Sequence, residues 1–306
     1  MANATKRSLF NVRRIFYPTD LSKESEVAFA HALKLALAYR AELRMMHIES
    51  KPGAASWDKF PHVRDTLAEW GLLPPGSDRQ AVAALGLRID KVLAPGSNPA
   101  RAILEFLDNR PADLLVLSTH QAGSGIAGWH RGGIAEPLAR HARMLTLFVP
   151  TLIDGFVSRK DGVVQLQRVL IPMDREPDPR PAIEAVADIG RALGCRTMAV
   201  TLVYVGAEAD MPQVTVPIQD GWTWNSVARP GDPVEQILRV ATEQPADLIA
   251  MTTQGHQGFL DALRGSTTER VLRAARCPVL AVPVPRATVE SPVLQVGPAD
   301  PQVMPA

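Results

Sequence analysis

Short apolar runs alternate with amphipathic stretches along most of the chain. Leu114–Ser118 and Leu248–Thr252 are almost continuously apolar, as in strands that are buried on both faces of a sheet. Between such runs, apolar residues recur at helical spacing, as they do within Ser22–Tyr39. The expected strands are Ile15–Tyr17, Glu42–Ile48, Asp90–Leu93, Leu114–Ser118, Leu145–Val149, Val169–Ile171, Met198–Val205, Trp224–Ala228, Leu248–Thr252 and Pro278–Val282. The expected helices are Ser22–Tyr39, Arg101–Asn109, Glu136–Arg143, Ala182–Leu193, Val234–Thr242 and Thr267–Ala275. Strands that alternate with helices predict mostly parallel sheets with helices on both faces.

The second half of the chain repeats the first. Pro18–Asp20 recurs as Pro172–Asp174 at an offset of 154 residues, and Pro111–Leu114 recurs as Pro245–Leu248 at an offset of 134. The two offsets differ because the second copy is shorter between these motifs. We therefore expect two tandem α/β domains, each a doubly wound, Rossmann-like sheet of five parallel strands.

Domain limits follow from the repeat. Residues 1–155 and 156–285 are expected to be the two domains, followed by a tail, 286–306, whose Pro-, Val- and Gly-rich sequence predicts disorder. Trp57–Leu87 is an insertion of the first copy and is expected to hold a helix that the second copy lacks. Gly206–Trp224, with two prolines, is expected to be a loop.

Pairing between the two last strands is a further expectation. Pro278–Val282 is apolar, as is Leu145–Val149, and each would otherwise be an exposed edge that invites aggregation. Pairing of these two strands within one chain would hide both edges. The sequence leaves open whether the whole chain pairs again as a homodimer, and it names no protein partner.

Composition excludes several classes of function. The formal charge is +1, whereas nucleic-acid binding needs a basic field, and a polybasic membrane-surface protein is excluded on the same ground. The two cysteines, Cys195 and Cys277, form neither a disulfide scaffold nor a zinc motif. The seven histidines show no compact metal-ligand spacing. No signal core and no run of 18 apolar residues occurs, so we expect a cytoplasmic protein without membrane contact.

The residues that carry chemistry lie after the strands of the second copy. In open parallel sheets, ligands bind at the carboxyl ends of the strands near the switch point. Asp174 follows the first strand of this copy and could accept hydrogen bonds from a ribose or an adenine amino group. Gly255, Gly265 and Ser266 follow its fourth strand, where glycines let the backbone approach a phosphate and a helix N-terminus offers free N–H groups.

These residues resemble the universal stress protein family. The family pattern is Gly, two residues, Gly, nine residues, Gly-Ser/Thr, and Gly255, Gly265 and Ser266 match its later part. Ile171–Asp174 and Gly231–Pro233 are also similar to the family, and the resemblance covers both copies. It implies that ATP or a related adenine nucleotide binds, with or without Mg²⁺. Because single domains of the family dimerise through their last strands, it also implies that Leu145–Val149 and Pro278–Val282 pair within one chain and give an internal pseudo-dimer. The nucleotide-binding residues implied in this way are Pro172, Asp174, Val205, Met251, Thr252, Gly255, Gly265, Ser266 and Thr267. Arg264 is the best-placed arginine for a phosphate contact.

The sequence departs from the family pattern in both copies. Thr252 stands at the first motif glycine of the second copy and is expected to crowd the backbone beside the ligand. In the first copy the corresponding places read Ser118, Gln121 and Gly132–Gly133, so two glycines and the hydroxyl are missing, although Asp20 remains. We therefore interpret the first site as degenerate and structural.

Structural explanations exist for some of the same residues. Ser266 and Glu269 match a capping box, which alone would account for the serine. Asp20 is well placed to cap the helix that begins near Ser22. Gly123–Gly128 matches the dinucleotide fingerprint, but it follows the fourth strand instead of the first and is better interpreted as a loop.

Three functions remain. The leading hypothesis is a cytoplasmic stress protein that binds an adenine nucleotide in its second domain as a regulatory ligand. The alternative is a scaffold that binds no nucleotide and acts through protein contacts. ATP hydrolysis has the least support, because Asp174 is the only acid placed to act as a base or a metal ligand. We therefore expect no catalytic residues and no resident metal.

Overall fold

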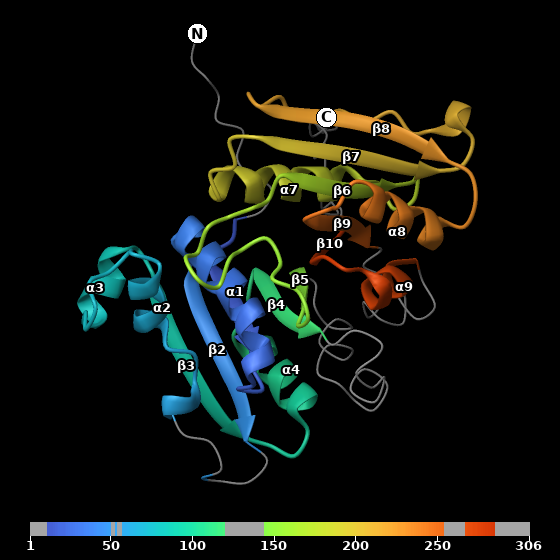
Figure 1. The fold of residues 1–306 in the computed structure, drawn as a ribbon. Helices are drawn as coiled ribbons and strands as arrows, with labels where there is room; N and C mark the ends of the chain where they lie inside the picture. Colours follow the sequence, from blue (N-terminus) through green and yellow to red (C-terminus); the bar gives the residue numbers. More distant parts are fainter. Residues whose placement is uncertain (1–10, 50–52, 54–56, 120–143, 254–266, 285–306) are drawn as a thin grey trace, which may run out of the picture.

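A computed structural model describes residues 11–49, 53, 57–119, 144–253 and 267–284 (Figure 1). Within them, ten strands form one continuous sheet. The strands are β1 (Arg14–Pro18), β2 (Glu42–Glu49), β3 (Arg88–Pro95), β4 (Leu114–Thr119), β5 (Leu145–Pro150), β6 (Arg168–Met173), β7 (Met198–Val205), β8 (Trp222–Arg229), β9 (Leu248–Thr253) and β10 (Val279–Pro283). The helices are α1 (Glu26–Tyr39), α2 (Val63–Glu69), α3 (Arg79–Ala84), α4 (Pro99–Asn109), α7 (Arg180–Ala192), α8 (Pro233–Glu243) and α9 (Thr267–Ala274). The predicted helix at Glu136–Arg143 lies outside the described residues.

Strand order confirms the predicted tandem architecture. The order is β3-β2-β1-β4-β5-β10-β9-β6-β7-β8, and each half is parallel throughout. β5 and β10 pair antiparallel, with Leu280 opposite Leu147, so the two five-stranded sheets join within one chain as expected. Every residue of β5 is buried, which explains why this junction is apolar.

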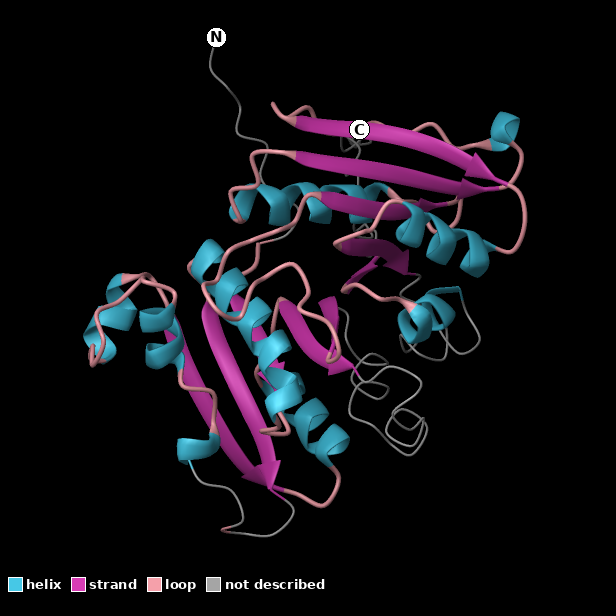
Figure 2. Cartoon of the chain, in the orientation of Figure 1, coloured by secondary structure: helices cyan, strands magenta, loops and turns pink. Residues whose placement is uncertain are grey.

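Two apolar layers flank the sheet. One lies between the sheet and α1 and α7, and the other between the sheet and α4, α8 and α9. Figure 2 shows these helices lying against the strands of both halves. The apolar residues of β4 and β9 contribute to both layers, as the uninterrupted apolar runs in the sequence predict.

A carboxylate clamp explains the repeated Pro-Ala-Asp sequence. Asp113 Oδ2 accepts hydrogen bonds from the backbone N–H groups of Arg13 (3.0 Å) and Arg14 (2.8 Å), while Oδ1 pairs with the Arg14 guanidinium at 2.9 Å. Asp247 repeats this at the start of β6, where it accepts from two consecutive backbone N–H groups and pairs with Arg168 at 3.2 Å. Each clamp ties the entry of a half's first strand to the entry of its fourth.

The insertion of the first half holds the connection between the halves. It contains α2 and α3, two helices where one was expected, and no counterpart occurs in the described part of the second half. Trp70 Nε1 donates to the Arg159 carbonyl at 3.0 Å, and a Cβ at Gly162 would lie 2.4 Å from the Trp70 ring. The connecting segment 151–167 is therefore packed against the insertion.

A buried histidine on α1 fixes the same segment. His31 Nδ1 donates to the Val27 carbonyl at 2.7 Å, so Nε2 is left as an acceptor for the N–H groups of Phe156 (3.0 Å) and Val157 (3.2 Å). Burial lowers the pKa of His31 from 6.5 to about 4, so the neutral ring is the native form.

The predicted loop at Gly206–Trp224 is too long. A short 3-10 helix occurs at Glu208–Asp210, and β8 begins at Trp222. Trp222 is buried, its ring lies against Gly190 of α7, and its Nε1 donates to the Cys195 carbonyl at 2.9 Å. These contacts join Trp222 to residues that are distant in sequence, so local pattern alone assigned Trp222 to the loop.

Candidate functional site

The carboxyl ends of three neighbouring strands define the candidate site of the second half. β6 pairs with β7 on one side and with β9 on the other, all in parallel, so their carboxyl ends share one edge of the sheet. The chain passes from β6 to β7 and later returns to β9, which places the switch point between β6 and β9. Asp174 lies directly after β6, Val205 is the last residue of β7, and Met251 and Thr252 lie near the end of β9.

Asp174 and Asp20 follow corresponding strands but have different contacts. Asp20 Oδ1 accepts from both the backbone N–H and the hydroxyl of Ser22, at 3.0 and 2.6 Å. The Ser22 hydroxyl in turn accepts from the N–H of Ser25 at the entry to α1, so Asp20 belongs to a helix-start network. Asp174 Oδ1 accepts only the N–H of the next residue, at 2.7 Å, and its Oδ2 has no hydrogen bond to any described residue.

The predicted nucleotide residues divide between the two faces of the sheet. Val205 and Met251 pack in the layer beneath α8 and α9, on the same side as α9, which begins at Thr267. Thr252 points to the other face, because successive residues of a strand alternate. Pro172 is half-buried within β6. Val205, Met251 and Thr267 therefore share a face that Thr252 does not.

Thr252 has a structural contact of its own. Its side chain is buried, and its hydroxyl accepts from the N–H of Ala182 at 3.3 Å. Ala182 lies in the first turn of α7, which has no side-chain cap on its N-cap residue. The hydroxyl at the position of the first motif glycine thus satisfies a helix N–H group, on the face away from Met251.

The glycine-rich parts of both predicted sites lie outside the described residues. These residues are Gly255, Arg264, Gly265 and Ser266 in the second half, and Gln121, Gly123–Gly128 and Gly132–Gly133 in the first. Their predicted roles stay predictions.

Two residues near the site received no specific role from sequence reasoning, although Asp232 lies within the family-like Gly231–Pro233. Asp232 caps α8 by accepting from the N–H of Glu235 at 3.1 Å, and Arg270 of α9 pairs with it at 3.3 Å. The pKa of Asp232 is lowered first by the Glu235 N–H and then by Arg270. The cap was readable from Asp232 followed by proline at the first helical position, whereas the arginine contact depends on how α8 and α9 pack.

Two kinds of site are not found in the part of the chain that the structure describes. No group of three or more His, Cys, Asp or Glu side chains is arranged to hold a metal ion. In the same residues, no helix is long and apolar enough to span a bilayer.

Comparison with known proteins identifies relatives of both halves. The model of the universal stress protein family matches residues 11–150 and 223–283. A universal stress protein of Synechocystis is 27% identical over 139 residues, which are 40% of this chain and 88% of that protein. The crystal structure of a universal stress protein from Archaeoglobus fulgidus has a TM-score of 0.55 at 17% identity, over 90% of this chain and 99% of that one, which indicates a shared fold. A universal stress protein solved in complex with cAMP is 25% identical over 46% of this chain and 98% of its own, with a TM-score of 0.34.

Proposed function

The chain belongs to the universal stress protein family, and from that premise we propose that its second half binds ATP or another adenine nucleotide as a regulatory ligand. The proposal takes 1–155 and 156–285 as the two domains and the cytoplasm as the location. The first domain has a structural role in it. No catalytic step is included.

Asp174 is the observation that carries the proposal. Its carboxylate is exposed at the carboxyl edge beside the switch point, and one of its oxygens is without a partner among the described residues. A carboxylate in this position can accept hydrogen bonds from ribose hydroxyls or an adenine amino group. Asp20, by contrast, already accepts two hydrogen bonds from Ser22.

Apolar and helical elements support the rest of the site. Val205, half-buried at the end of β7, supplies apolar surface for the base on the α9 face, and the buried Met251 packs in the layer behind it. Thr267 begins α9, whose N-terminus favours phosphate through its backbone N–H groups and its dipole. Gly255, Gly265, Ser266 and Arg264 complete the proposed phosphate cradle.

Calorimetric titration of the full chain with ATP, ADP and AMP tests the proposal. We expect Asp174→Ala to weaken binding by roughly tenfold or more, the effect of losing hydrogen bonds to a charged group. Asp20→Ala is the matched control, because it removes the corresponding carboxylate from the first half and should leave nucleotide binding unchanged.

A second variant tests the phosphate end of the site. Gly265→Val should abolish ATP binding, because a branched side chain blocks close approach of the backbone to phosphate. Circular dichroism of this variant checks that it remains folded. Absence of heat with all three nucleotides would refute the proposal and favour a nucleotide-free scaffold.

A further inference from the structure

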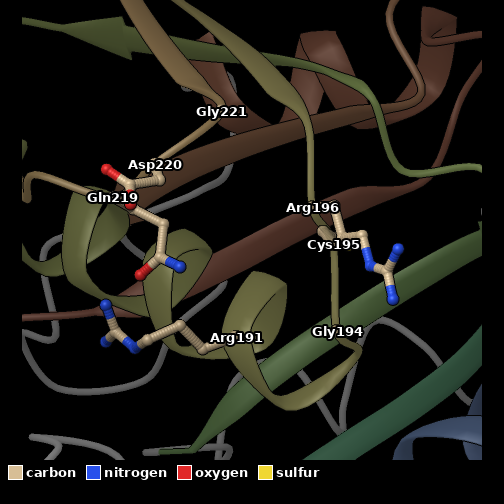
Figure 3. A pocket seen from close by; sticks show the side chains of 7 residues that line it. All are labelled: Arg191, Gly194, Cys195, Arg196, Gln219, Asp220 and Gly221. Atoms are coloured by element: carbon tan, nitrogen blue, oxygen red, sulfur yellow. The ribbon is translucent and has the colours of Figure 1, made fainter.

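Two cavities lie at the edge of the sheet opposite the proposed nucleotide site, where the strands begin. The larger has a volume of about 1320 Å³ and lies between the halves, lined by the entry to β1, the end of α1, the entry to β3 and Asp188 of α7. The smaller, of about 500 Å³, lies at the corresponding place in the second half. Figure 3 shows Arg191 and Gln219 on one side of the smaller cavity and Arg196 on the other.

Arg40, in the larger cavity, has a backbone conformation that suits glycine. It follows α1 with φ of 51°, in the left-handed region that side chains with a Cβ disfavour. The repeat places Gly194 at the corresponding position after α7, with φ of 70°. The hydrogen bonds around the two positions match, since Ala41 N–H donates to Ala36 and Cys195 N–H donates to Gly190. The first half thus keeps an arginine where the same turn needs only a glycine.

Gly86 makes room for the Arg40 side chain. A Cβ at Gly86 would lie 3.1 Å from Arg40 Cγ and 3.2 Å from Cδ, tighter than most real contacts. Gly86 itself has φ of 79°, in the left-handed region that favours glycine. A glycine here therefore suits the turn that leads into β3, and it also leaves space for the aliphatic part of the Arg40 side chain. The stem therefore packs over Gly86 within the cavity wall.

Two arginines of this wall have no acidic partner among the described residues. They are Arg40 and Arg13, and among the described residues the Arg13 guanidinium donates a hydrogen bond only to the Asn11 amide oxygen, at 3.1 Å. The three carboxylates of the wall, those of Asp113, Glu42 and Asp188, are already engaged. Their partners are Arg14 at 2.9 Å, Arg88 at 3.1 Å and the Tyr39 hydroxyl at 2.8 Å, respectively.

We propose that this cavity between the halves binds a small anion with several phosphate groups, held by Arg40 and Arg13. The guanidinium fork matches the geometry of phosphate oxygens and donates two hydrogen bonds at once. The two arginines come from different elements, the entry to β1 and the end of α1, so a ligand with more than one phosphate can engage both. The volume exceeds what inorganic phosphate needs and lies above the usual range of small-molecule pockets, roughly 300–1000 Å³. This site is independent of the nucleotide site proposed at the carboxyl edge.

Titration with tripolyphosphate at constant ionic strength tests the proposal, with binding followed by calorimetry. The wild-type chain should bind it, and Arg40→Gly should weaken binding by roughly tenfold, since it removes a charge-assisted contact. This variant should fold, because Gly194 occupies the same turn in the second half. Arg196→Ala removes an exposed arginine from the smaller cavity and is the matched control with unchanged affinity.

Further arms separate the possible sources of binding. Gly265→Val should leave tripolyphosphate binding in place, since the nucleotide cradle lies at the other edge. Citrate should bind more weakly than tripolyphosphate if phosphate groups are recognised. The proposal is overturned if the wild type does not bind tripolyphosphate, if Arg40→Gly binds it equally well, if only Gly265→Val loses it, or if citrate binds as tightly.

Discussion

The first helices of the two halves, α1 and α7, have the same frame but differ at particular positions. Both end in a left-handed turn, and both halves carry the same aspartate clamp at the entry of the first strand. His31 of α1 holds the connecting segment, whereas the corresponding residue of α7 is the buried Ala185. Arg40 occupies the turn that Gly194 fills in α7.

Comparison of the two halves shows which positions are the same in both copies and which differ. The clamps fix strand entries in both halves and tie residues that are far apart in sequence, so they are retained. Arg40 at the end of α1, Asp20 after β1 and Asp174 after β6 are exposed, and at these places the halves differ in residue or in contacts. Asp20 belongs to a helix-start network, while the Asp174 carboxylate is exposed and accepts only the N–H of Arg175 among the described residues.

Replacing His31 by alanine, the residue at the corresponding position of α7, should cause the largest loss of stability. His31→Ala leaves the buried N–H groups of Phe156 and Val157 without an acceptor and opens a cavity. We expect a loss of about 4 kcal/mol in the free energy of unfolding, measured by urea denaturation. His62→Ala, an exposed control, should change it little. A loss below about 1 kcal/mol would show that His31 does not hold the connection.

Acid should weaken the first half through the same histidine. The pKa of His31 is about 4 in the folded chain and 6.5 without burial, so the unfolded chain takes up the proton first as pH falls. Stability contributed by the neutral ring is full above pH 6.5 and is lost progressively down to about pH 4, by about 3 kcal/mol at 1.36 kcal/mol per pH unit. Urea unfolding between pH 7 and 4.5 should show this slope in the wild type and a shallower one in His31→Ala. Equal slopes would contradict the assignment.

Removing either carboxylate clamp should lower the stability of the chain by a similar amount. Asp113→Asn and Asp247→Asn each remove the charge and one acceptor oxygen from a carboxylate that binds two N–H groups and an arginine. Burial raises the pKa of Asp113, but Arg14 and the backbone N–H groups outweigh it, so the pKa is lowered and the charged form is native. Each variant should lose about 2 kcal/mol in urea unfolding. If one variant is strongly destabilised and the other is unchanged, the clamps are not equivalent.

Substitutions at Arg40 and Gly194, which follow α1 and α7, should change the free energy of unfolding least. The two changes should have opposite signs. Gly194→Ala should destabilise by about 1 kcal/mol, because the left-handed turn disfavours a Cβ and nothing lies within 4 Å to compensate. Arg40→Gly should stabilise by about 0.5 kcal/mol, since relief of the turn is partly offset by the entropy of glycine in the unfolded chain. Thermal unfolding of both variants measures this. Shifts of the same sign would refute the comparison.

Much of the fold follows from local pattern. Apolar runs predicted the strands, and the Pro-Ala-Asp repeat indicated two copies that the clamps now explain. The β5–β10 pairing was expected from the family resemblance, and it hides two apolar edges that would otherwise be exposed. The start of β8 at Trp222 was not predictable from local pattern, because Trp222 is held by its contact with Gly190 of α7.

The candidate site was predictable only in part. The resemblance predicted roles for Asp174, Val205 and Met251, and the strand order brings the ends of their strands together. It gave no sign that Thr252 turns to the opposite face and binds the Ala182 N–H, because that contact depends on where α7 begins. Arg40 escaped notice for a similar reason: its backbone angle, and not its residue type, distinguishes it.

The number of ATP molecules bound per chain tests the central claim most directly. Equilibrium dialysis of the wild-type chain with labelled ATP should give one per chain. The ratio should fall toward zero in Asp174→Ala and stay at one in Asp20→Ala. The central claim is that the second half binds nucleotide and the first half does not. It would be contradicted by two ATP molecules per wild-type chain, by none, or by equal binding in the wild type and Asp174→Ala.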